Sequence, residues 1–207
     1  MKKAIIIPYR GTISDKSRLH TDLEQSLLES LLHNVTQHVL QEALGVKGVD
    51  RVYLLTQKNN LGFRGNYERL LDKGEGLNDS IQNMLYEIKE EVRIIIMADL
   101  PLVTSQNIQE VIDYHISTND VVLAPTEDNG TSIICFNKNI NLPRLFGKNS
   151  SLRFKEYFKN NEIGFNLLNY RESYRDIDTF KDLIKISKNE LLSKELISIF
   201  KECVKIE

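Results

Sequence analysis

What this sequence has little of excludes several kinds of protein. It contains only two cysteines, Cys135 and Cys203, too few for a disulfide framework and not spaced as a metal-binding pair. We expect both to be reduced thiols. No apolar run approaches the roughly 20 residues that a membrane helix needs. The segment from Met1 to Pro8 is too short for the apolar core of a signal peptide and is expected to be a first strand. These absences predict a cytoplasmic protein without a membrane partner.

The charges are nearly balanced. The chain has 27 Lys and Arg residues against 29 Asp and Glu residues, a net charge of −2, so no general attraction to nucleic acid is expected. Apolar residues make up 41% of the chain, as is usual for a soluble globular protein. The length of 207 residues favours a single domain over 1–207.

Apolar periodicity predicts alternating strands and helices. Strands are expected at 4–7, 49–56, 92–97, 120–124, 131–136 and 165–170. Helices are expected at 23–39, 78–90, 105–116, 151–158 and from 179 to the end of the chain. Thr21 or Asp22 would cap the first helix and Gly45 would end it. Residues 9–20 are expected to be a loop, and 57–75 are ambiguous, with a short helix conceivable at 67–71.

This alternation predicts an α/β fold: a single-domain, Rossmann-like, mainly parallel sheet with helices on both faces. In such sheets, ligands bind beyond the carboxyl ends of the strands, at a switch in strand order. The loop after the first expected strand is therefore of interest. It carries Arg10, Lys16 and Arg18 with a glycine and small hydroxyl residues, which could cradle a triphosphate. It matches neither a P-loop nor a dinucleotide fingerprint, so a solvated basic loop is the commoner explanation when it is taken alone.

Acidic residues stand out at two places. Asp99 directly follows a strand expected to be fully buried and precedes Pro101. A carboxylate in apolar surroundings is costly unless it is paired or binds a metal, so we favour function over a turn cap. Asp176 and Asp178 are two residues apart, so they share a face in an extended segment and a cation between them is favourable. The alternative is that Asp178 caps the helix expected from Thr179 and Asp176 is solvated.

Two further segments combine glycine with hydroxyl residues. Gly130 and Thr131 form one, and Gly147 with Ser150 forms the other. Both could bind a phosphate or carboxylate through N–H and O–H groups, and both are equally suited to be ordinary turns or helix caps. The four histidines lack the spacing of a zinc site.

The order of these blocks is more specific than any one of them. Asp-Lys-Ser-Arg-Leu at 15–19, Gly-Leu-Asn at 76–78, Ala-Asp-Leu-Pro-Leu at 98–102, Gly-Thr at 130–131, Phe-Gly at 146–147 with Ser150, and Asp-Ile-Asp-Thr at 176–179 follow one another. This order resembles the 2-phospho-L-lactate guanylyltransferase family, a branch of the nucleotide-diphospho-sugar transferase-like fold. The resemblance covers residues 3 to about 185.

The resemblance implies an enzyme of coenzyme F-420 biosynthesis. GTP and a small phosphorylated three-carbon acid (2-phospholactate, phosphoenolpyruvate or 3-phosphoglycerate) would react with release of pyrophosphate, with Mg²⁺ as the cofactor. The implied magnesium ligands are Asp99, Asp176 and Asp178, and the implied catalytic residues are Lys16, Asp99 and Asp178. The implied nucleotide-binding residues are Pro8, Arg10, Lys16, Arg18, Leu77, Asn78 and Asp99, with Asn78 near the base. The implied acceptor-binding residues are Thr131, Gly147 and Ser150.

Three positions depart from the family pattern: Arg10 stands where many relatives have lysine, Asn129 where a glycine is common, and Asn149 where a small residue is common. Rival readings are a molybdopterin guanylyltransferase, a sugar-phosphate cytidylyltransferase, or a non-catalytic nucleotide-binding module. A homodimer is left open.

Overall fold

One seven-stranded sheet organises the chain. The computed structural model describes residues 1–10, 17–59 and 62–205. The strands are β1 (Lys3–Pro8), β2 (Arg51–Thr56), β3 (Glu68–Leu71), β4 (Val92–Ile96), β5 (Val121–Pro125), β6 (Thr131–Asn137) and β7 (Phe165–Leu167). Their spatial order is β3-β2-β1-β4-β6-β5-β7. All pairings are parallel except those of β6, which runs antiparallel to β4 and β5. The mainly parallel α/β fold predicted from the sequence is confirmed.

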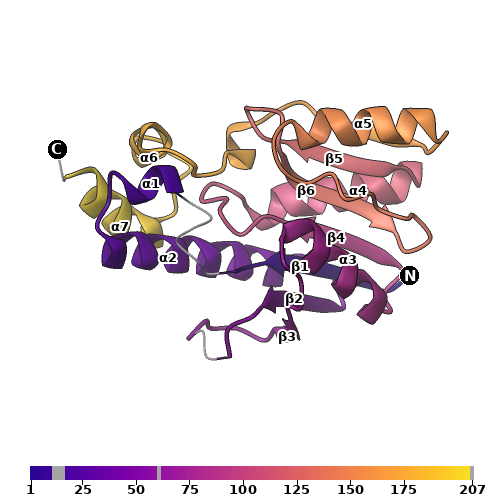
Figure 1. Cartoon of the computed structure of the whole chain (residues 1–207), viewed down its shortest axis with the longest axis horizontal. Coiled ribbons are helices and arrows are strands. Elements are labelled where there is room, and N and C mark those ends of the chain that lie inside the picture. Colours follow the sequence, from indigo (N-terminus) through magenta and orange to yellow (C-terminus); the bar gives the residue numbers. More distant parts are fainter. Residues whose placement is uncertain (11–16, 60–61, 206–207) are drawn as a thin grey trace.

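Helices cover both faces of this sheet (Figure 1). On one face, α2 (Gln25–Leu44) and α4 (Ser105–Thr118) pack against alternate strand residues such as Ile5 and Ile7. On the other, α3 (Leu77–Glu87) and α5 (Ser150–Asn160) pack against the residues between them, such as Ala4 and Ile6. Because both faces are buried, the central strands read as continuous apolar runs rather than alternating ones.

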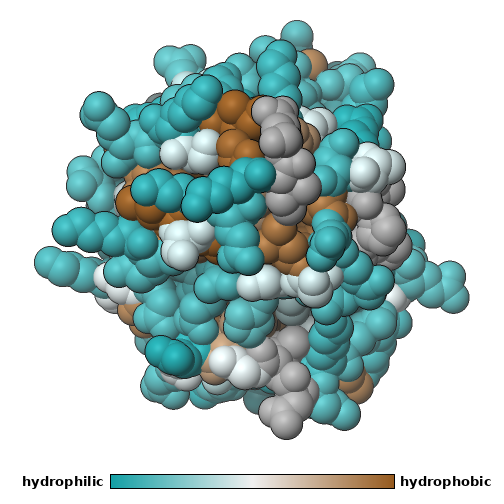
Figure 2. All heavy atoms as spheres, turned by 90° about the vertical axis from the view of Figure 1, so that its left-hand side faces the viewer, coloured by the Kyte–Doolittle hydropathy of each residue, from teal (hydrophilic) through white to brown (hydrophobic). Residues whose placement is uncertain are grey.

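A third cluster lies at one end of the molecule. Here α1 (Ser17–His20), α6 (Phe180–Ser187) and α7 (Lys194–Val204) gather around the first half of α2 (Figure 1). Figure 2 views this end and shows apolar side chains between hydrophilic ones. Leu191, in the turn between α6 and α7, is 55% exposed. The homodimer left open by the sequence stays a prediction.

Local signals explain several boundaries and correct some predictions. Gly45 ends α2 as predicted, but the cap position at its start is Glu24 rather than Thr21 or Asp22, and no side chain caps it. The conceivable helix at 67–71 is wrong: Glu68–Leu71 is the edge strand β3, parallel to β2. The expected helix from 179 to the end is two helices, separated by a turn at 188–193.

The remaining differences are small. The expected loop 9–20 ends in the short helix α1, and β7 stops at Leu167 rather than 170.

Cys135 and Cys203 are both buried and unbridged. Within the part of the chain that the structure describes, no helix combines the length and the apolar character needed to cross a membrane.

Candidate active site

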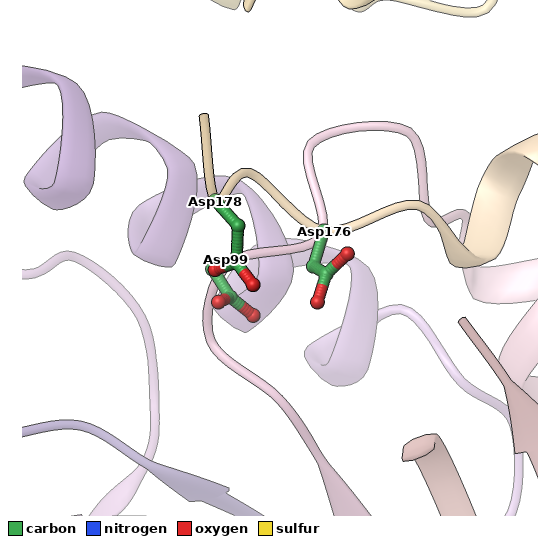
Figure 3. Close-up of side chains that lie close together, drawn as sticks. All are labelled: Asp99, Asp176 and Asp178. Carbon is green, nitrogen blue, oxygen red and sulfur yellow. The ribbon is translucent and has the colours of Figure 1, made fainter. Parts of the chain in front are cut away.

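Three carboxylates from distant parts of the chain meet at one place. Asp99 lies in the segment after β4, whereas Asp176 and Asp178 lie just before α6. Figure 3 shows the three side chains converging on one space. Each offers a ligand atom, and these atoms all lie within 4.8 Å of one another, with all three residues half-buried. The convergence that the sequence predicted is therefore present.

Their spacing suits a hard divalent cation. Two oxygens on one magnesium ion stand at most about 4.2 Å apart, twice the usual Mg–O distance of about 2.1 Å. Small side-chain rotations would bring these three carboxylates into that range. Magnesium usually takes few carboxylates and fills its remaining positions with water and substrate phosphates. Three partly exposed carboxylates fit that pattern.

Backbone structure holds the two acidic segments together. The N–H of Ile177 donates to the carbonyl of Asp99 at 3.2 Å, so the two segments touch directly. The Ile177 side chain is fully buried among residues of α2, α6 and α7. Because alternate residues in an extended segment face opposite sides, burying Ile177 turns Asp176 and Asp178 toward the same side.

The helix-capping alternatives for Asp178 and Asp99 do not hold. Thr179 caps α6, and Asp182 completes the capping box. Thr104 caps α4 in the same way, paired with Asn107. Neither Asp178 nor Asp99 is therefore needed as the cap of the helix that follows it.

The carboxylates line a cavity of about 680 Å³. It lies beyond the carboxyl ends of the neighbouring strands β1 and β4. This is the switch point of the sheet, because β2 and β3 are added on the β1 side and the later strands on the β4 side. Its lining residues are Arg18, Leu77, Met97, Asp99, Thr126, Asp128, Gly130, Thr131, Phe146, Gly147, Lys148, Ser150, Asp176 and Asp178. Residues of all the predicted groups are present, namely the metal ligands, the nucleotide-binding set and the acceptor-binding set.

The two hydroxyl segments meet on one wall. The hydroxyls of Thr131 and Ser150 lie 2.8 Å apart, and both residues are buried. Ser150 is the first residue of α5, and no side chain caps that helix. The N–H groups of Gly147, Lys148 and Asn149 form no hydrogen bond to any other residue that the structure describes. Free N–H groups at a helix start, next to two hydroxyls, are suited to an anion.

The predicted nucleotide-binding residues are only partly gathered at the cavity. Arg18 and Leu77 line it. Pro8 ends β1, and the guanidinium of Arg10 lies 3.9 Å from the buried carboxylate of Asp72. Lys16 falls outside the described residues.

Asn78 has backbone partners. Its side-chain amide bonds both the N–H and the carbonyl of Phe146. The role of Asn78 in reading the base stays a prediction.

Sequence reasoning missed Thr126, Asp128 and Lys148, which also line the cavity. The carboxylate of Asp128 accepts from the Thr126 hydroxyl and from the N–H of Gly130 at 3.2 Å, which shapes the turn after β5. The position of Thr126 and Asp128 directly after a strand was the available signal. Lys148 follows the Phe-Gly pair, and no separate signal in the sequence indicated that it lines the cavity.

Arg175 is a buried cation that no motif or periodicity in the sequence distinguishes. It is only 3% exposed and contacts carboxylates of Glu127, Glu172 (2.9 Å) and Asp182 (3.8 Å). These contacts join the turn after β5 to the segment that carries Asp176. The hydrogen bonds that Arg175 donates to Glu172, and secondarily to Glu127, raise the pKa of Arg175. The same hydrogen bonds lower the pKa of both glutamates.

Replacing Arg175 by Met should destabilise the protein and change its response to acid. Arg175 is buried, but Glu127 is 55% and Glu172 is 41% exposed, so both glutamates would be left hydrated and the loss should be about 1–2 kcal/mol. Because the glutamate pKa values are lowered in the folded state, their stabilisation is present above the ordinary value of about 4.3 and is lost as pH falls below it. Urea unfolding at several pH values tests this: stability should fall more steeply with acid in the wild type than in Arg175→Met. Equal slopes would contradict it.

The fold and the site together define a class. The chain has the nucleotide-diphospho-sugar transferase-like fold, and the carboxylate cluster and the anion-binding wall lie at the switch point of its 3-2-1-4-6-5-7 sheet. A solved protein from Desulfovibrio desulfuricans G20, described as a nucleotide-diphospho-sugar transferase, superposes with a TM-score of 0.79. The match covers 100% of this chain and 97% of that one, at 14% identity.

Sequence comparison narrows the class to a family. The family model described as guanylyl transferase CofC like matches residues 3–199, and the chain belongs to this family. The 2-phospho-L-lactate guanylyltransferase of Methanocaldococcus jannaschii is 27% identical, over 95% of this chain and 88% of that protein. The phosphoenolpyruvate guanylyltransferase of Thermobaculum terrenum is 24% identical, over 90% of this chain and 84% of that protein. The family resemblance predicted from the ordered blocks is confirmed.

Proposed function

We propose that this protein is a magnesium-dependent guanylyltransferase. It joins GMP from GTP to a small phosphorylated three-carbon acid, with release of pyrophosphate, in the biosynthesis of the deazaflavin coenzyme F-420. The observation that carries the proposal is the convergence of Asp99, Asp176 and Asp178 beside an anion-binding wall, in a chain of the guanylyl transferase family. The names of the relatives, which specify 2-phospholactate and phosphoenolpyruvate, support this acceptor class.

In the proposed reaction, a phosphate oxygen of the acceptor attacks the α-phosphorus of GTP. The new P–O bond forms as the bond to the β-phosphate oxygen breaks, and pyrophosphate leaves with the electron pair. No general base is required, because a phosphomonoester with a second pKa near 6 is largely a dianion at neutral pH. Magnesium held by Asp99, Asp176 and Asp178 would neutralise phosphate charge and orient the two substrates.

The chain's own residues orient the acceptor. One of the Thr131 and Ser150 hydroxyls donates to the other, so the second would donate its hydrogen bond to the acceptor. The N–H groups of Gly147 to Asn149 would donate to the negatively charged oxygens of the acceptor. Arg18, one of two described cations that line the cavity, would stabilise the departing pyrophosphate.

A pyrophosphate-release assay tests the proposal. The protein is mixed with magnesium, one of GTP, CTP or ATP, and one acceptor. The acceptors are 2-phospholactate, phosphoenolpyruvate, 3-phosphoglycerate, a sugar phosphate and molybdopterin. We expect release with GTP and at least one of the phosphorylated three-carbon acids. Release only with CTP and a sugar phosphate would indicate a cytidylyltransferase, and release only with a molybdopterin acceptor would indicate a molybdopterin guanylyltransferase. Nucleotide binding without release from any acceptor would indicate a non-catalytic module.

Replacing Ser150 by Ala should weaken the binding of the acceptor and leave the binding of the nucleotide unchanged. One hydrogen bond to a charged phosphate would be lost, which raises the KM for the acceptor by roughly tenfold or more. The KM for GTP should stay within about twofold of the wild-type value. Ser117→Ala, an exposed serine on α4, is the matched control. An unchanged acceptor KM in Ser150→Ala would remove Ser150 from the acceptor site.

A further inference from the structure

One face of α3 holds the segment that leads into the anion-binding wall. Three polar residues near the start of this helix contact residues 142–146. The Gln82 amide donates to the carbonyl of Leu142 at 2.6 Å, and Asp79 pairs with Arg144 at 2.6 Å. Asn78, nearest the cavity, makes the third contact. Together they fix residues 142–146 along the first turns of α3.

Asn78 makes the most specific of these contacts. Its side-chain N–H donates to the Phe146 carbonyl at 3.1 Å, and its side-chain oxygen accepts from the Phe146 N–H at 2.9 Å. A side-chain amide that bonds both groups of one residue imitates strand pairing and fixes position and orientation together. The Phe146 ring is buried and packs edge-on against the ring of Phe154 in α5, with the two ring centroids 5.1 Å apart. Phe146 is thus held through both its backbone and its side chain.

This contact sets the starting point of the wall. Gly147 follows Phe146 directly, with φ 121°, a conformation that strains any residue except glycine. The Gly147 carbonyl then accepts from the N–H of Ser150 at 3.0 Å, which closes the turn into α5. Any shift of Phe146 would therefore move the N–H groups and the hydroxyl proposed to bind the acceptor.

We propose that Asn78 is a positioning residue for the acceptor and does not read the nucleotide base. The inference rests on the proposed guanylyltransferase function and assigns Asn78 to the other substrate. Leu77, its neighbour, lines the cavity, whereas Asn78 is not among the described residues that do so. To contact a base, the Asn78 amide would have to release two good hydrogen bonds to Phe146. The first turn of α3 would then contact both substrates, the nucleotide through Leu77 and the acceptor indirectly through Asn78 and Phe146.

Kinetics of Asn78→Ala separate the two roles. A positioning role predicts that the KM for the acceptor rises about tenfold or more, since two hydrogen bonds are lost. The KM for GTP and the preference for GTP over ATP should stay within about twofold of the wild type. Gln82→Ala should shift the acceptor KM in the same direction by less, because its contact lies farther from Gly147. Asn83→Ala, an exposed residue on the same helix, is the matched control and should change neither constant.

The opposite pattern would overturn the inference. A base-reading Asn78 predicts a raised KM for GTP and a reduced preference for GTP over ATP, with the acceptor KM unchanged. Asn78→Asp refines the comparison, because it keeps the oxygen that accepts from the Phe146 N–H but loses the donor. We expect its acceptor KM to exceed that of the wild type, because the added carboxylate oxygen faces the Phe146 carbonyl, and a wild-type acceptor KM would contradict the positioning role.

A second readout keeps this test distinct from that of the proposed function. Hydrogen exchange of the Phe146 N–H should be faster in Asn78→Ala than in Asn83→Ala, whether or not the protein turns over. Faster exchange in Asn78→Ala, together with no pyrophosphate release by the wild type with any acceptor, would refute the function while retaining the contact. Unchanged exchange, or turnover with unchanged acceptor KM, would refute the positioning role alone.

Discussion

Replacing Asp99 by Asn should reduce the rate of pyrophosphate release by about a thousandfold or more while the protein stays folded. The substitution keeps the size of the side chain but removes a charge that no other described carboxylate can supply from the β4 side of the site. Losing one metal ligand is expected to raise the barrier by several kcal/mol, about 1.4 kcal/mol for each tenfold in rate. Asp176→Asn and Asp178→Asn should fall in the same range, because all three ligand atoms share one space.

Asp113→Asn is the matched control for this series. Asp113 is an exposed carboxylate on α4 and is not among the described residues that line the cavity. Its rate should equal that of the wild type. Magnesium dependence adds a second criterion, since the three site variants should need more magnesium for half-maximal rate or fail to respond to it. A rate in Asp99→Asn within tenfold of the wild type would exclude Asp99 as a ligand.

Replacing Ile177 by Ala should cost about 3 kcal/mol of unfolding free energy and also impair turnover. Ile177 is fully buried in the cluster formed by α2, α6 and α7, so truncating it leaves a cavity there. The same residue spaces Asp176 from Asp178 and donates its N–H to the Asp99 carbonyl. A looser fit at Ile177 should therefore loosen the carboxylate cluster.

Ile177→Val separates packing from chain geometry. It removes one methyl group and should cost about 1 kcal/mol, with nearly normal turnover. Urea unfolding gives the free energies, and the pyrophosphate assay gives the rates. If Ile177→Ala lost stability but kept the full rate, the buried side chain would not be what orients Asp176 and Asp178.

The sequence predicted the core of the fold because its central strands are apolar on both faces. The run at Val92–Ile96 could hardly be anything but a buried strand, and it places Asp99 at the edge of the sheet. The two-residue spacing of Asp176 and Asp178 likewise placed both carboxylates on one side. In both cases a local rule of chain geometry was sufficient.

Other features depend on contacts that no local pattern carries. The strand β3, with sequence Glu-Arg-Leu-Leu, has no strand periodicity of its own and is fixed by parallel pairing with β2. Arg175 looks like any surface arginine until Glu127 and Glu172 close around it. Asn78 lies in a block that resembles a nucleotide-binding motif, but its partner, Phe146, is 68 residues away in the chain. Long-range pairing of this kind becomes visible only in the folded structure.

The most direct test of the central claim is anomalous diffraction from crystals grown with Mn²⁺ and a non-hydrolysable GTP analogue. Mn²⁺ takes the oxygen ligands that magnesium prefers and can be located by its anomalous signal. We expect an anomalous peak about 2.2 Å from carboxylate oxygens of Asp99 and of at least one of Asp176 and Asp178. A nucleotide bound in the cavity without a manganese peak at these carboxylates would contradict the proposed metal site.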